Sequence, residues 1–163
     1  QIALTEFLSH NDGAERTISN LHTLINGLDL NFECGGLKMT PLVTAICNNC
    51  DTSIVLELIK NGADVNKRGQ WNLTPLYVAV EKKNYSLVQE LLKNGASKSI
   101  NEKCTDNADT SLTPLELARK NKSEAIIVTL GSELERIAAI GQEQPQQPQP
   151  QPHRPAPACP ARS

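Results

Sequence analysis

A tripeptide, Thr-Pro-Leu, recurs along the chain and constrains the fold more than any other feature. It begins at Thr40, Thr74 and Thr113, so successive copies are 34 and 39 residues apart. A Lys-Asn-Gly-Ala sequence also recurs, at 60–63 and 93–96. Self-similarity at a period of roughly 20–50 residues is typical of repeat proteins, whose units bury their apolar faces only against neighbours. The chain is therefore predicted to form a solenoid of stacked units.

The copy at 74–95 shows how one unit is built. Apolar residues follow the Thr-Pro pair, and Leu87, Val88, Leu91 and Leu92 then recur at helical spacing, so two short helices are expected. Threonine suits an N-cap, and proline suits the next position because its missing N–H costs nothing there. Glycine ends a helix because it adopts the left-handed conformation without a Cβ penalty. The residues given these structural roles are Thr40, Pro41, Leu42, Thr74, Pro75, Leu76, Thr113, Pro114, Leu115, Gly62 and Gly95.

The repeated segments resemble the ankyrin repeat. TPLVTAI at 40–46, TPLYVAV at 74–80 and TPLELAR at 113–119 are similar to the start of that repeat, and NGADVN at 61–66 matches its hairpin entry. The resemblance covers about residues 20–130. It implies an all-α solenoid of helix-turn-helix repeats joined by β-hairpin loops. Tyr77 replaces the histidine of the family motif and is given a structural role.

The chain is predicted to hold one repeat domain, 1–140, and a tail, 141–163. About four units are expected: a degenerate N-terminal cap repeat at 1–31, then 32–66, 67–99 and 100–140. Gly131 stands where a leucine is expected, so a short capping helix is predicted from Ser132 to Ile140. Proline and glutamine dominate residues 142–163, and such a Pro/Gln-rich tail is expected to be disordered, with polyproline II character.

The resemblance implies a protein partner. In ankyrin arrays the hairpin tips and the ends of the first helices line a concave binding face. Trp71 is the only tryptophan, and tryptophan and arginine are enriched in interface hot spots. A partner contact by Trp71 is favoured over packing against a neighbouring hairpin. Carried over by position, the partner-binding residues are Arg68, Gln70, Trp71, Leu73, Glu81, Lys82, Leu37, Met39, Cys47, Asn48, Asp109, Thr110, Leu112, Lys120 and Asn121.

The sequence motifs do not support an enzymatic or metal-binding function. The sequence contains no Gly-rich phosphate loop, nucleophile elbow or H-E-x-x-H, so no catalytic residue and no cofactor are predicted. Cys47 and Cys50 form a C-x-x-C, but a zinc site needs two more ligands at suitable spacing. The five cysteines are odd in number and irregularly spaced, which favours free thiols in a reducing, cytoplasmic setting.

Neither nucleic acid nor a membrane is expected as a partner, because the net charge is −2 and no apolar run approaches the roughly 20 residues of a membrane span. A monomeric protein-interaction module is the leading hypothesis. A second is a targeting or regulatory part of a larger enzyme or effector, since the chain begins at Gln1. In a third, the tail is the ligand: Pro157–Arg162 has the P-x-x-P-x-R form that SH3 domains bind. The long connection 97–112 is interpreted as a tolerated loop rather than a contact arm.

Overall fold

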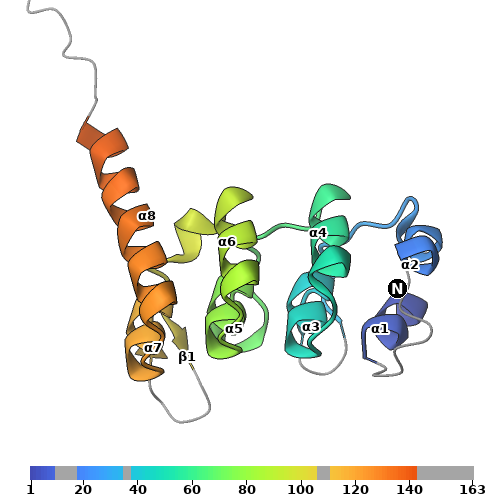
Figure 1. The fold of residues 1–163 in the computed structure, drawn as a ribbon. Coiled ribbons are helices and arrows are strands. Elements are labelled where there is room, and N and C mark those ends of the chain that lie inside the picture. Colours follow the sequence, from blue (N-terminus) through green and yellow to red (C-terminus); the bar gives the residue numbers. More distant parts are fainter. Residues whose placement is uncertain (10–17, 35–37, 106–110, 143–163) are drawn as a thin grey trace, which may run out of the picture.

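Helix pairs stack side by side in a computed structural model of the chain, which describes residues 1–9, 18–34, 38–105 and 111–142 (Figure 1). The first helices of the pairs form one row and the second helices form another, so the predicted all-α solenoid is confirmed. Of the predicted tail 141–163, residues 143–163 lie outside the described residues, whereas Gly141 and Gln142 form the end of the last helix. The pairs are α1 (Ile2–Ser9) with α2 (Ile18–Ile25), α3 (Pro41–Cys47) with α4 (Thr52–Lys60), α5 (Pro75–Glu81) with α6 (Tyr85–Lys93), and α7 (Pro114–Lys120) with α8 (Glu124–Gln142). The connections contain 3₁₀ turns η1 (Gln70–Asn72) and η2 (Ala96–Ser99) and strands β1 (Cys104–Thr105) and β2 (Ser111–Leu112).

The three Thr-Pro-Leu segments start α3, α5 and α7. The hydroxyls of Thr40 and Thr74 each accept the backbone N–H three residues ahead at 3.2 Å. Thr113 accepts the N–H of Glu116 at 3.3 Å, and the Glu116 carboxylate accepts the N–H of Thr113 at 2.8 Å, which completes a capping box. Each threonine therefore satisfies an N–H that the helix itself cannot pair.

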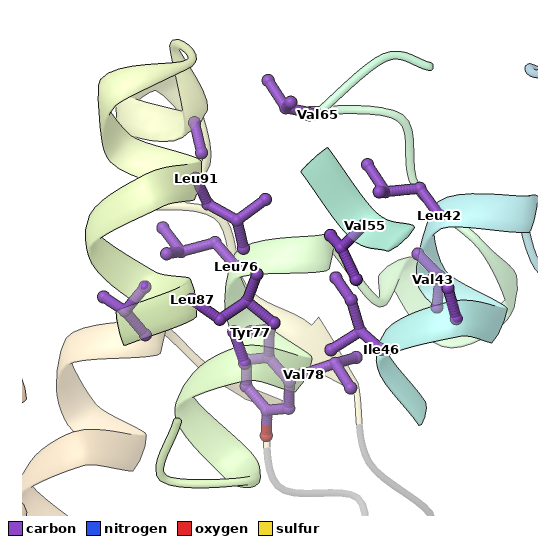
Figure 2. Packing of buried hydrophobic residues seen from close by; sticks show 14 of the residues in the cluster. Leu42, Val43, Ile46, Val55, Val65, Leu76, Tyr77, Val78, Leu87 and Leu91 are labelled. Carbon is purple, nitrogen blue, oxygen red and sulfur yellow. The ribbon is translucent and has the colours of Figure 1, made fainter. Parts of the chain in front are cut away.

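A continuous apolar core runs along the stack. Leu76 of α5 is fully buried and lies close to Leu87 and Leu91 of α6, with Val55 of α4 nearby (Figure 2). Helix α5 packs against α3, α6 and α7, so the central pair is covered on both sides. Tyr77 is also buried, in agreement with its structural role.

Two asparagines link consecutive helix pairs, and the sequence analysis did not single them out. The Asn31 side-chain amide donates to the carbonyl of Gly62 at 3.0 Å. The Asn66 amide donates to the carbonyl of Gly95 at 3.0 Å, and its oxygen accepts the hydroxyl of Ser99 at 2.7 Å. These contacts satisfy backbone carbonyls at the ends of α4 and α6. These asparagines could have been found in the sequence, because each follows an aliphatic residue shortly before a new unit, in Leu30-Asn31 and Val65-Asn66.

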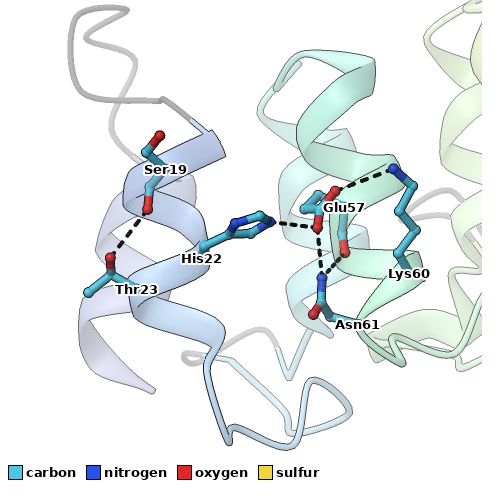
Figure 3. A network of polar contacts seen from close by, with 6 residues as sticks. All are labelled: Ser19, His22, Thr23, Glu57, Lys60 and Asn61. Atoms are coloured by element: carbon cyan, nitrogen blue, oxygen red, sulfur yellow. Dashed lines mark hydrogen bonds and ion pairs between the residues drawn. The ribbon is translucent and has the colours of Figure 1, made fainter.

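A polar contact fixes α2 against α4 (Figure 3). The His22 ring nitrogen lies 2.7 Å from the carboxylate of Glu57, which also accepts the Asn61 amide at 3.0 Å and pairs with Lys60 at 3.5 Å. The hydrogen bond from His22, with a smaller contribution from Asn61, holds the pKa of Glu57 below its ordinary value. A carboxyl group whose pKa is lowered by folding stabilises the fold at pH values above its pKa in the unfolded chain. That contribution is lost as the pH falls through the lowered pKa.

The second helix of the last pair is longer than the sequence analysis expected. The predicted boundary at Gly131 and the separate capping helix 132–140 are wrong: α8 runs without a break from Glu124 to Gln142. One glycine in a helix costs only about 1 kcal/mol, while Leu130 before it is buried and Leu134 after it packs against the core. The end of α8 extends beyond α6, and residues 135–140 are exposed (Figure 1).

Gly131→Ala is expected to raise the free energy of unfolding by about 0.5–1 kcal/mol, because alanine has the higher helix propensity. An added Cβ meets no atom within 4 Å. The matched control is Gly95→Ala, where the space is equally open but φ is +92°. There the same change is expected to cost about 1 kcal/mol. Urea denaturation of both variants measures the sign of each change in the free energy of unfolding. A loss of stability in Gly131→Ala contradicts the helical assignment.

Candidate functional site

Hairpin turns precede α3, α5 and α7 and contact one another along the stack. In the first turn Cys34 and Met39 form an antiparallel bridge. In the second, the N–H of Gly69 donates to the carbonyl of Leu73 at 2.9 Å. The third consists of β1 paired with β2. A Cβ at Gly69 would lie 3.3 Å from the Cα of Met39, so the second turn packs tightly on the first.

The second turn holds Trp71 in an unfavourable backbone conformation. The N–H of Leu73 donates to the carbonyl of Gln70 at 3.2 Å, and the two residues between them, Trp71 and Asn72, have φ of 57° and 56°. A two-residue turn with both φ values positive prefers asparagine and glycine. An aromatic residue in the left-handed region costs on the order of 1 kcal/mol. Trp71 therefore occupies this turn at a cost to local stability.

The surroundings of Trp71 leave part of it open to solvent. Its exposed fraction is 37%. Its carbonyl accepts the hydroxyl of Thr105 at 3.2 Å, which ties the turn to β1 of the third hairpin. The side-chain oxygen of the adjacent Gln70 is buried and has no hydrogen-bond partner within the described part of the chain. The turn thus combines an accessible aromatic ring with an unpaired acceptor.

Arg68, also predicted to meet a partner, is engaged within the array. Its Nε and Nη2 lie 3.1 and 2.5 Å from the two carboxylate oxygens of Glu102. Both side chains remain partly exposed, so solvent screens the pair and it contributes little to stability. Glu102 and Thr105 belong to the long connection 97–112, which therefore supports the preceding hairpin in addition to joining two units.

The remaining predicted partner-binding residues divide by exposure. Those at the C-terminal ends of α5 and α7 are exposed: Glu81, Lys82 and Lys120. Two half-buried residues cap first helices: Asn48 and Asn121. Four others are half-buried and pack against the core: Met39, Cys47, Leu73 and Leu112. Three lie outside the described residues: Leu37, Asp109 and Thr110.

The cysteines of the described residues are free: Cys34, Cys47, Cys50 and Cys104. Burial raises the pKa of the Cys34, Cys47 and Cys104 thiols, and a protonated, covered thiol is a poor nucleophile and metal ligand. Within the described ranges no group of three or more His, Cys, Asp or Glu side chains is placed to hold a metal ion. No helix in that part of the chain is long and apolar enough to cross a membrane.

Three further residues share a feature that the sequence analysis missed. Asn49, Lys83 and Lys122 have φ of 50°, 55° and 53°. Each lies nine residues after the threonine that caps its first helix, at the turn into the second helix. Glycine is the residue that adopts this conformation freely, so the common offset after Thr-Pro-Leu was the available signal.

Comparison with known proteins agrees with this architecture. Residues 9–104 and 54–135 match the sequence profile of a family described as ankyrin repeats, in three copies. Alpha-latrocrustotoxin-Lt1a of Latrodectus tredecimguttatus is 29% identical over 136 residues, which cover 63% of this chain and 9% of the toxin. The 2-5A-dependent ribonuclease of Mus musculus is 52% identical over 46 residues, 28% of this chain and 6% of that enzyme. The matched part of the chain therefore spans less than a tenth of either relative.

Proposed function

This chain belongs to the ankyrin repeat family. We propose that it is a non-catalytic module that binds a protein partner through its hairpin turns and the C-terminal ends of α5 and α7. Ankyrin repeats are generally protein-interaction modules. Trp71 carries the proposal for this face: a partly exposed tryptophan occupies a left-handed turn position that favours smaller residues. The free cysteines support a reducing compartment such as the cytoplasm.

The contacts around Trp71 favour binding by a preformed surface. The turn is held from one side by the close approach of Gly69 to Met39 and from the other by the hydrogen bond from Thr105. A surface that is ordered before binding loses little conformational entropy on association.

Affinity capture from a lysate tests the proposal with three proteins: the full chain, Trp71→Ala, and a chain that lacks residues 143–163. The same partner is expected on the full chain and on the truncated chain, and its recovery is expected to fall with Trp71→Ala. Circular dichroism confirms that each protein is folded. Loss of the partner on truncation alone favours the tail as the ligand and overturns the proposed face.

A further inference from the structure

Positive side chains gather where α5 turns into α6 and where α7 turns into α8. All are exposed, and within the described ranges the four lysines make no ion pair. Arg119 interacts with Glu116 of its own helix. The set, named here the cationic edge, consists of Lys82, Lys83, Arg119, Lys120 and Lys122.

The two turns lie next to each other on one edge of the array. Helices α5 and α7 pack together, and Lys83 and Lys122 occupy equivalent positions, nine residues after their caps. Cys47, at the end of α3, interacts with the charges of Glu81 and Lys82, so the ends of consecutive first helices are neighbours. Packed helices are about 8–10 Å apart, so a separation on the order of 10 Å is expected between the backbones at Lys83 and Lys122.

Backbone conformation gives a second, independent reason to regard the edge as functional. Lys83 and Lys122 both have positive φ, where glycine is the more stable choice. Asn49, at the same position of the preceding unit, is of a residue type that tolerates the left-handed region. Strained residues at exposed positions are frequent at binding sites. The two lysines thus place positive charge at a conformational cost.

The charge balance favours a short acidic ligand. The acidic residues beside the edge are Glu81, Glu124 and Glu116, the last of which interacts with Arg119, so five cations face three acids and leave an excess of two positive charges. The chain as a whole carries −2. A long polyanion such as nucleic acid extends beyond the edge and is repelled by the rest of the protein, which is net negative, whereas a short acidic peptide stays on the edge.

We propose that the cationic edge binds an acidic, extended segment of the protein partner, a refinement that rests on the proposed protein-binding function. The segment runs along the array across the two turns. In the polyproline II conformation every third side chain lies on the same side, and three residues span about 9 Å. Carboxylates three residues apart therefore match the spacing of Lys83 and Lys122.

Fluorescence anisotropy with the labelled peptide (Glu-Pro-Pro)₄ tests the proposal on the full chain at low salt. The peptide is expected to bind, with an affinity that falls as salt rises, and (Gln-Pro-Pro)₄ is not. The double variant Lys83→Gly/Lys122→Gly is expected to weaken binding about tenfold, while its thermal midpoint rises because glycine relieves the left-handed strain. A weaker affinity together with a higher thermal midpoint excludes misfolding as the cause of the weaker binding.

The charge-matched control is Lys93→Gln/Lys98→Gln, at the end of α6 and in η2, which is expected to change peptide affinity by less than about twofold. Absence of binding by the wild type, or an unchanged affinity of the glycine double variant, overturns the proposal. Tighter binding of a thymidine pentanucleotide, which also carries four negative charges, overturns it in favour of nucleic acid. Partner capture that survives the glycine changes but is lost with Trp71→Ala overturns the cationic edge alone and leaves the protein-binding function standing.

Discussion

Replacing Leu76 with alanine is expected to lower the free energy of unfolding by about 2–5 kcal/mol. Leu76 is fully buried in α5, close to Leu87 and Leu91 of α6 (Figure 2). The shortened side chain leaves a cavity, and α5 cannot move to fill it because α3, α6 and α7 hold it on three sides. Urea denaturation followed by circular dichroism measures the loss.

The control for this core substitution is Ile140→Ala, near the end of α8, where the side chain is 61% exposed. A change within about 0.5 kcal/mol is expected there. Leu8→Ala removes an equally buried leucine from the first helix pair, which within the described part of the chain packs against one neighbouring pair, α3 and α4. Since units of a solenoid are coupled only to their neighbours, this variant is expected to broaden the transition. Equal losses from Leu76 and Ile140 contradict the described core.

The helices that begin at Thr-Pro-Leu could be predicted from the sequence because their determinants are local. Thr74 caps an N–H only three residues away, and the buried Leu87 and Leu91 are one helical turn apart. Cap chemistry and the 3.6-residue period both act within a few residues, so they can be read without knowing the tertiary structure. The same holds for the glycines at the ends of α4 and α6, both with positive φ.

The face of the array was less predictable because its exposure depends on contacts between units. Arg68 and its partner Glu102 are 34 residues apart, and their pairing follows from how two hairpins stack. Cys47 and Leu73 occupy positions where a partner contact was expected, yet both pack against the core. Transfer by position locates a residue on the backbone but does not report how far neighbouring units cover it.

Gly131 shows a different limit of sequence interpretation. Glycine is a helix terminator only where the chain adopts a positive φ, as at Gly62 and Gly95. In α8, Leu130 immediately before Gly131 is buried, and Leu134, three residues after it, packs against the core in the same helical register. Tertiary packing therefore outweighed a local propensity of about 1 kcal/mol.

Trp71→Asn is expected to weaken partner binding by about 2 kcal/mol or more, roughly thirtyfold in Kd. The free energy of unfolding is expected to change by less than about 1 kcal/mol. Asparagine suits the left-handed position at 71, where φ is 57°, and this gain offsets the lost packing of the buried part of the ring. Isothermal titration calorimetry with the captured partner, together with urea denaturation, measures both quantities.

The adjacent Asn72 provides the matched control, since its φ of 56° is also positive. Asn72→Gly relieves strain in the same turn but keeps the tryptophan, so stability is expected to rise by up to about 1 kcal/mol with affinity unchanged. If Trp71→Asn instead unfolds the array, or keeps full affinity, the indole serves packing between hairpins. Reduced affinity at preserved stability assigns it to recognition, because only contact with a partner couples the aromatic ring to binding without coupling it to folding.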